Sequence, residues 1–405
     1  MLNPDYLLHI SEGAEDIAEQ LHQDIINRII DRMMERIGRG EDYLLTATDK
    51  WQIEVLQDAG YLLEDIQKEI AKATKKQEQE IKEAFEEAGV KALDYDDKIY
   101  QDAGLSPVPL TQSPYLTRLM QRNYEATLGE WKNYTRTTAS VAQQAFIKAI
   151  DKAYALTTSG AVSYAQAVKE AINDIASSGV EVKYSTGHKD SIETATLRAV
   201  RTGVSKATGT IQMARMEEMD WDIILTSAHL GARTGDGGMN PGNHLWWQGQ
   251  FFSRTGRTPG LPLFEESTGY GTVEGLCGAN CRHSFGPGDG VHNPFSGISK
   301  EDNYKAEQLQ KKQRALERRI RNTKREVMTL KEAVDSAQDQ KLKYELDVDY
   351  QKKSAILQRQ NEAYNKFCGD NSLKKLSDRL QIAKWDRQQA AAARGAAQRY
   401  YSASN

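Results

Sequence analysis

Hydrophobic positions near the start of the chain recur at the spacing of one helix face. Between residues 15 and 37 an apolar side chain returns every four residues, at Ile17, Leu21, Ile25, Ile29, Met33 and Ile37. Apolar positions three to four residues apart lie on the same side of an α-helix. The pattern predicts an amphipathic helix that ends at Gly38 and Gly40, because glycine is favoured just past a helix C-terminus.

The same helical spacing continues further along the chain. A second helix is predicted through Val55, Leu62 and Ile70, and residues 68–87 then carry mostly Lys, Gln and Glu. We interpret that charged stretch as a solvated helix face with ion pairs four residues apart. Proline is concentrated between Leu105 and Pro114, which predicts a hinge or boundary. Further helices are predicted over 115–156, 163–176 and 190–220.

The pattern changes after residue 220. Residues 221–226 form a short apolar run with β-branched side chains, which predicts a strand. From residue 226 to 287 the helix formers become rare and Gly, Pro, Asn and aromatic residues take their place. Gly and Pro interrupt helices, so this part predicts a compact module of loops and strands. Its aromatic residues predict a small core of its own, built from Trp246, Trp247, Phe251 and Phe252.

Residues 300–365 contain neither Gly nor Pro. Apolar residues follow a rough heptad stripe, which predicts a long helix or a helical hairpin with coiled-coil character. The predicted fold is therefore mainly α with a small α/β central module. We expect four segments along the chain: N-terminal helices at 1–105, further helices at 106–179, the central module at 180–295 and long C-terminal helices at 296–405.

Composition narrows the classes of protein to consider. A chain of 405 residues can hold two or three domains, and its 39% hydrophobic residues allow a modest core. Three cysteines make no disulfide framework, which indicates synthesis in a reducing compartment. The N-terminal residues lack the pattern of a secretory signal. The sequence contains no run of about 18 apolar residues, so no membrane span is predicted.

The formal net charge of −4 argues neither for nor against binding to nucleic acid, so local charged segments have to be considered instead. Within 305–325, basic residues far outnumber acidic ones. Such a segment can contact a phosphate backbone, which requires charge and no base-specific groups. It can equally be the solvated flank of a coiled coil, and both interpretations stay open here. The candidate contact residues are Lys311, Lys312, Arg314, Arg318, Arg319, Arg321, Lys324 and Arg325.

Two cysteines and three histidines fall within residues 226–287. Cys277, Cys281 and His283 stand within seven residues of one another, and zinc sites commonly combine Cys sulfur with His nitrogen. A fourth ligand would come from His229, His244 or an acid. We predict a zinc site of Cys277, Cys281, His283 and His229. The alternative is that the cysteines are buried core residues.

At these residues the chain resembles the phage minor capsid protein 2 family, relatives of the Mu F-like head morphogenesis proteins. The resemblance covers roughly residues 180–294 and is carried by several short motifs in order. Where the Mu F-like pattern closes with Cys-Arg-Cys, this chain has Cys281-Arg282-His283. The matching motifs are Ser227-Ala228-His229-x-x-Ala232-Arg233, Trp247-Gln248-Gly249, Thr268-Gly269-Tyr270-Gly271 and Leu276-Cys277-Gly278-x-Asn280-Cys281-Arg282-His283-Ser284, with Tyr184-Ser185-Thr186-Gly187 and Val200-Arg201-Thr202-Gly203-Val204 upstream.

The resemblance implies a structural, non-enzymatic minor capsid protein of a tailed phage, made in the host cytoplasm and carried in the virion. It also implies partnership with the portal and other head proteins, and a part in head morphogenesis and DNA packaging or delivery. The residues add the expectation that apolar helix faces in 15–156 contact the portal, and that 305–325 contacts phage DNA.

An enzyme is the alternative. His229 and His283, together with the acids Asp236, Glu265 and Glu266, would supply a metal-activated water and a general base in the central module.

Overall fold

The computed structural model describes residues 1–44, 48–178, 180–184 and 187–404. Helices make up 70% of the structure and strands only 4%, which confirms a mainly α fold with a small α/β module. Ser185 and Thr186, which belong to one of the upstream motifs, lie outside the described residues. Within the described part, none of the helices combines the length and apolar character that crossing a bilayer would require.

The chain forms two compact units, and each is assembled from three separate stretches. Unit 1 comprises Met1–Glu15, Lys75–Lys132 and Thr194–Lys311, and unit 2 comprises Asp16–Thr74, Asn133–Glu193 and Lys312–Asn405. A contiguous fragment such as residues 1–178 therefore holds only part of each unit.

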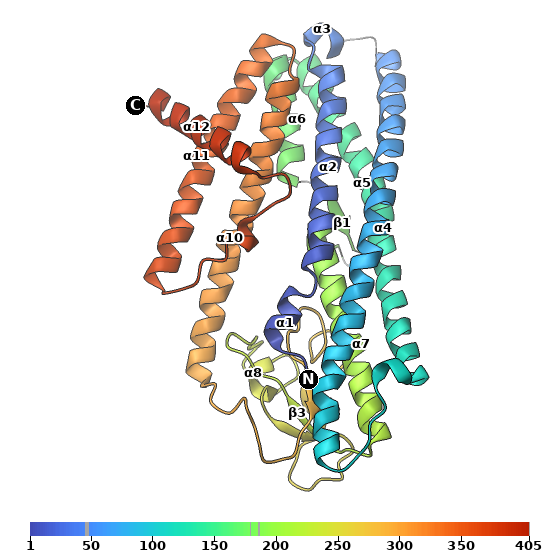
Figure 1. Ribbon diagram of the computed structural model, residues 1–405. Helices are drawn as coiled ribbons and strands as arrows, with labels where there is room; N and C mark the ends of the chain where they lie inside the picture. Colours follow the sequence, from blue (N-terminus) through green and yellow to red (C-terminus); the bar gives the residue numbers. More distant parts are fainter. Residues whose placement is uncertain (45–47, 179, 185–186, 405) are drawn as a thin grey trace. The chain divides into compact units, whose positions relative to one another are not determined.

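Long helices dominate the first half of the chain (Figure 1). The helix predicted for residues 15–37 is observed as α2, and the charged stretch 68–87 lies inside the single helix α4. Lys82 and Glu86 form one of the expected pairs across a helix turn, at 3.7 Å. The helices are α1 Pro4–His9, α2 Glu12–Ile37, α3 Glu41–Leu44, α4 Thr48–Asp102, α5 Pro114–Thr158, α6 Tyr164–Ser178 and α7 Ile192–Glu218.

The proline-rich segment joins two helices of unit 1. Helix α4 ends at Asp102, a short 3-10 turn spans Leu110–Gln112, and α5 begins at Pro114. Further along, Lys132 of α5 forms an ion pair with Glu78 of α4 at 3.0 Å. The two helices therefore run back alongside each other, and the prolines mark the turn between them.

The helical core of unit 1 is built by α1, α4, α5 and α7. Small and branched apolar residues of these helices are fully buried against one another. Burial of this kind is the main favourable term in folding. The core includes Leu7, Ile81, Phe85, Ala88, Leu116, Val200, Val204 and Ile211.

The module of unit 1 contains a three-stranded antiparallel sheet. Strand β3 (Ile223–Thr226) lies between β4 (Phe251–Ser253) and β5 (Phe285–Pro287). Ile224 faces Phe252 on one side and Pro287 on the other. The strand predicted for 221–226 is confirmed from residue 223 onward. In unit 2, β1 (Glu181–Lys183) and β2 (Lys189–Ser191) form a separate antiparallel pair.

The C-terminal region is a helical hairpin followed by a third helix. Helices α10 (Lys300–Ser336) and α11 (Gln340–Asp370) are joined by a short turn, where the Asp339 side chain accepts the Leu342 backbone N–H. Within unit 2, Glu326 of α10 pairs with Lys353 of α11 at 2.6 Å. After the 3-10 turn Asp378–Leu380, helix α12 (Arg387–Ser404) packs against α11 (Figure 1). The predicted hairpin is thus observed.

Candidate functional site

The module that holds the candidate site has a small aromatic core. Trp247 and Phe252 are fully buried together with Phe264 and Phe285. Trp247 lies on the short helix α8 (His244–Trp247), and Phe264 begins α9 (Phe264–Thr268). The predicted aromatic core is therefore confirmed for Trp247 and Phe252, and their packing fixes α8 against the sheet.

The loop between β3 and α8 is tied to the beginning of α10. The Ala232 backbone N–H donates to Asn303 Oδ1, and Asn303 Nδ2 donates back to the Ala232 carbonyl, both at 2.9 Å. Two residues on, the Thr234 hydroxyl donates to the Glu307 carboxylate at 2.8 Å. These bonds hold in place the loop that delivers Arg233 and His244.

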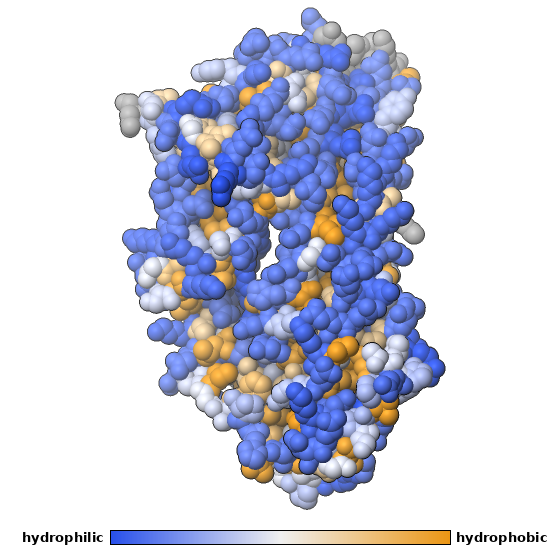
Figure 2. Space-filling model, in the orientation of Figure 1, coloured by the Kyte–Doolittle hydropathy of each residue, from blue (hydrophilic) through white to orange (hydrophobic). Residues whose placement is uncertain are grey.

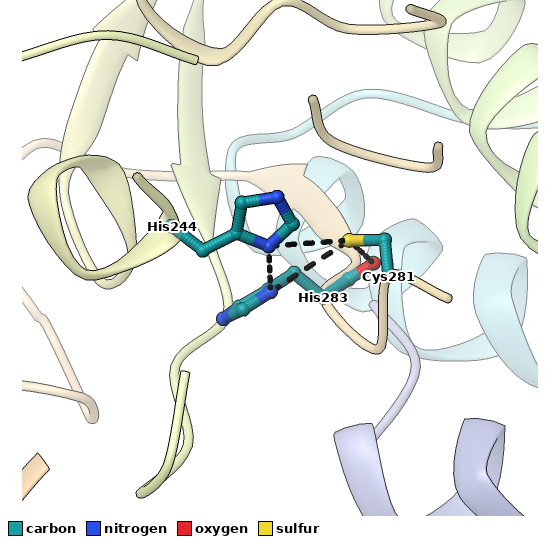
Figure 3. A group of neighbouring side chains, drawn as sticks. All are labelled: His244, Cys281 and His283. Atoms are coloured by element: carbon teal, nitrogen blue, oxygen red, sulfur yellow. Dashed lines mark hydrogen bonds between the residues drawn. The ribbon is translucent and has the colours of Figure 1, made fainter. Parts of the chain in front are cut away.

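Three side chains of the module converge on one point (Figure 3). His244 Nδ1 and His283 Nδ1 are 3.3 Å apart, and Cys281 Sγ lies 3.9 Å from the first and 3.7 Å from the second. Each of the three residues is at most 2% exposed. We call His244, Cys281 and His283 the Cys/His group.

Unusual backbone angles shape the loop that carries Cys281 and His283. Cys277 and Asn280 have positive φ values of 59° and 58°, in the left-handed region that side chains other than Gly and Asn rarely adopt. At Gly278 an added Cβ would lie 2.3 Å from the Thr272 carbonyl oxygen. The glycine permits this close approach of two backbone segments, and the loop then leads into β5.

The hydrogen bonds of Gln248 determine the protonation of His283. The His229 backbone N–H donates to Gln248 Oε1 at 3.1 Å, which fixes the orientation of the amide. His283 Nε2 is 3.0 Å from the same oxygen, so Nε2 carries a proton and donates it. The neutral ring then has a bare Nδ1, and this is the nitrogen that faces His244 and Cys281.

His244 Nε2 has two close neighbours of opposite kind. The Glu274 carbonyl oxygen and Arg233 Nη2 each lie 2.8 Å from it. A protonated Nε2 donates to the carbonyl and leaves Nδ1 bare, whereas a bare Nε2 accepts from Arg233 and puts the proton on Nδ1. Arg233 also donates to the Glu274 carbonyl at 3.2 Å, as expected for an arginine that binds loop carbonyls.

Burial keeps these side chains uncharged in the absence of a cation. It lowers the pKa of His244 to about 3, and the Arg233 charge acts in the same direction. It also lowers the pKa of His283 well below its ordinary value. Burial raises the pKa of the Cys281 thiol, and it raises that of Cys277 to about 12. Charged forms are disfavoured because the low-dielectric interior solvates them poorly.

The structure assembles a different set from the four ligands predicted from sequence. Cys281 and His283 converge with His244, which was one of the alternatives for the fourth ligand. Among the described residues, the Cys/His group is the set whose ligand atoms all lie within 4.8 Å of one another, and neither Cys277 nor His229 belongs to it. The His229 ring instead stacks on His283, with centroids 4.4 Å apart.

The acids named for the enzyme alternative lie on the surface. Glu265 and Glu266 are exposed on α9. Asp236 is also exposed, and its carboxylate accepts from the Gly238 N–H at 2.9 Å and from Asn240 at 2.7 Å. None of these three acids belongs to the buried Cys/His group, so none of them is placed there as a general base.

The basic residues of 305–325 divide into two sets. Lys311, Lys312, Arg318 and Arg319 are exposed along α10. The others are at least half-buried, and two of them bind the segment after α11. Arg321 donates to the Arg379 carbonyl at 2.6 Å, and Lys324 donates to the Leu380 carbonyl. These latter contacts are structural ones within unit 2.

Arg325 is the centre of a buried charged cluster in unit 2. Its Nη2 lies 2.6 Å from a carboxylate oxygen of Glu19 and 2.6 Å from one of Glu193. The other Glu193 oxygen is 2.7 Å from His22 Nδ1, and His22 Nε2 accepts the Val180 backbone N–H at 3.1 Å. We call Glu19, His22, Glu193 and Arg325 the charge cluster. Sequence reasoning missed it, because each member occurs alone in an ordinary amphipathic pattern.

A comparison with protein families gives one match. The model of the family described as phage minor capsid protein 2 matches residues 2–364. No curated protein and no solved structure matches the chain. The family match confirms the resemblance seen at residues 180–294 and extends it over the helices on both sides.

Proposed function

The chain belongs to the phage minor capsid protein 2 family, and from this membership we propose that it is a portal-associated structural protein acting in head morphogenesis. A structural role in the phage head follows from the family itself. The observation that carries the proposal is the extent of the match, which takes in the long helices as well as the central module.

An exposed apolar face on α4 supports a docking role. Ile53, Leu56 and Tyr61 are 58%, 62% and 59% exposed. Ile53 and Leu56 are three residues apart and lie on the same side of the helix. Hydrophilic residues cover most of the face drawn in Figure 2, and contiguous apolar residues on a soluble surface commonly mark a contact with a partner. We propose that this face of unit 2 binds the portal.

The test uses the full-length chain, because each unit combines three distant stretches and fragments would divide both. The chain is co-expressed with the portal protein of the same phage, and the complex is isolated on a tagged portal. The double variant Ile53→Asp, Leu56→Asp is expected to lose co-purification, since two carboxylates cannot be buried in an apolar contact without a large cost. Raising the salt concentration should change wild-type binding little, because apolar burial is not screened.

A matched control is available on α11. Tyr344 is 71% exposed in the same unit, and Tyr344→Asp should leave portal binding unchanged. Circular dichroism checks that all variants are folded. Retained binding by the folded double variant would show that the portal contact lies elsewhere on the chain.

The exposed part of the basic segment supports a second, weaker contact, with phage DNA. Arg318 and Arg319 are adjacent and exposed on α10. Replacing both by Ala should weaken DNA binding and reduce its dependence on salt, by about 0.9 in the log–log slope for each phosphate that is no longer neutralised. Lys366→Ala, an exposed position on α11, is the control in a fluorescence titration. An equal reduction in affinity for both variants would point to unspecific charge attraction.

A further inference from the structure

The Cys/His group has the dimensions of a tetrahedral metal site. Zinc bonds to His nitrogen are about 2.0–2.1 Å long and those to Cys sulfur about 2.3 Å. At tetrahedral angles these lengths separate two nitrogens by about 3.3 Å and a sulfur and a nitrogen by about 3.6 Å. The observed separations are 3.3 Å between the nitrogens, and 3.7 and 3.9 Å from the sulfur. An ion can therefore sit between the three atoms with little movement of the side chains.

The outer hydrogen bonds match those of metal-binding histidines. A ligating histidine usually donates its other ring N–H to a carbonyl, carboxylate or water, which orients the ring. His283 donates Nε2–H to Gln248, and the Glu274 carbonyl lies 2.8 Å from His244 Nε2. Each acceptor lies on the far side of its own ring from Nδ1, so the two Nδ1 atoms are directed at each other.

Without a cation, only one tautomer of His244 satisfies both rings, the one in which Nε2 accepts from Arg233 and Nδ1–H donates to His283 Nδ1. His283 Nδ1 is bare, and a His244 ring that donates to Glu274 presents a second bare nitrogen 3.3 Å away. Two facing lone pairs repel each other, and buried polar atoms without a partner are costly. A metal ion satisfies both nitrogens and the sulfur at once, and it selects the His244 tautomer that donates to Glu274.

We infer that His244 Nδ1, Cys281 Sγ and His283 Nδ1 bind one zinc ion, with a water molecule as the fourth ligand. The ion joins α8 to the loop before β5, two segments nearly forty residues apart in sequence. Each ligand is at most 2% exposed, so the ion lies inside the module. This inference goes beyond the proposed portal function and does not depend on it.

The first test measures metal in the full-length wild-type chain. Protein purified from zinc-supplemented medium should contain about one zinc per chain by elemental analysis. After removal of the metal with a chelator, Co²⁺ should restore one equivalent and give the intense ligand-field absorption of a tetrahedral centre, with a sulfur-to-cobalt charge-transfer band. Zinc should also raise the melting temperature of the stripped protein, because a ligand that binds only the native state stabilises it.

Matched variants then separate the two ligand sets. Cys281→Ser and His244→Asn should lose the metal and the cobalt spectrum. Cys277→Ser and His229→Asn should keep both, although Cys277 is as buried as Cys281 and the His229 ring stacks on His283. Equal metal loss in a folded Cys277→Ser variant would overturn the proposed ligand set.

The wild-type measurements decide the outcome if a variant fails to fold. Wild-type protein that contains no zinc and takes up neither Zn²⁺ nor Co²⁺ would overturn the inference. So would a cobalt spectrum without the sulfur charge-transfer band, because Cys281 would then not be a ligand.

Discussion

The Cys/His group of unit 1 and the charge cluster of unit 2 both bury polar side chains, but they balance them differently. In the charge cluster, Arg325 lies between the carboxylates of Glu19 and Glu193, and His22 completes the hydrogen bonding. Donors and acceptors face each other there. In the Cys/His group, two ring nitrogens and a sulfur face one another, and the zinc ion inferred above is the cation that would bind all three.

This difference shows how a buried cluster can be assigned a role before its chemistry is tested. A buried cluster in which every donor has an acceptor rigidifies the fold and requires no bound ion. A cluster whose lone pairs converge has room for a cation. Added zinc should therefore stabilise the Cys/His group and leave the charge cluster unchanged. Removal of one member should abolish metal binding in the first and lower the free energy of unfolding in the second.

The largest expected effect comes from removing the central cation of the charge cluster. Arg325→Met leaves Glu19 and Glu193 buried without their partner. Breaking a buried ion pair on one side typically costs about 3–5 kcal/mol in the free energy of unfolding. Urea denaturation followed by circular dichroism measures the change, and added zinc should not restore it.

Arg319→Met is the matched control on the same helix. Arg319 is exposed, and surface substitutions usually change stability by no more than about 0.5 kcal/mol. Equal destabilisation by the two variants would contradict the claim that Arg325 acts through its buried partners.

A smaller loss in the free energy of unfolding is expected when the pH is lowered. Burial opposes ionisation of Glu193, but His22 and Arg325 outweigh it and hold its pKa well below the ordinary value of 4.5. The folded state therefore binds this proton less readily than the unfolded state does. The stabilisation is fully present above about pH 4.5 and is lost as pH falls toward the folded-state pKa, by about 1.4 kcal/mol per pH unit.

Glu193→Gln isolates this contribution. Glu19 acts in the opposite direction, because burial raises its pKa in the folded state. Urea midpoints measured at several values between pH 5 and 3 should fall less steeply for the Gln variant than for the wild type. Parallel curves would show that Glu193 is not the group that responds.

Local patterns predicted the helices well, because apolar spacing reports directly which face of a helix is buried. The turn of the C-terminal hairpin has a recognisable signal as well. Asp339 caps α11 through the Leu342 N–H, and such a capping residue marks a helix start even where Gly and Pro are missing. No local sequence signal shows which stretches of the chain belong to which unit, because this depends on contacts between residues far apart in the sequence.

The Cys/His group was predictable only in part. Cys281 and His283 are close in sequence, so their proximity could be expected. Which histidine joins them depends on the path of the loop after β3, which the bonds of Ala232 and Asn303 fix from α10. Spacing alone could not distinguish His244 from His229, nor show that the backbone at Cys277 is left-handed.

The interleaved make-up of the two units has a consequence for synthesis on the ribosome. Neither unit is complete after the first 193 residues, because unit 1 also requires Thr194–Lys311 and unit 2 requires Lys312–Asn405. At translation rates of 5–20 residues per second, the remaining chain takes about 10–40 s to make. The early helices must therefore wait for packing partners that are made later, and the nascent chain is a natural client for chaperones during that interval.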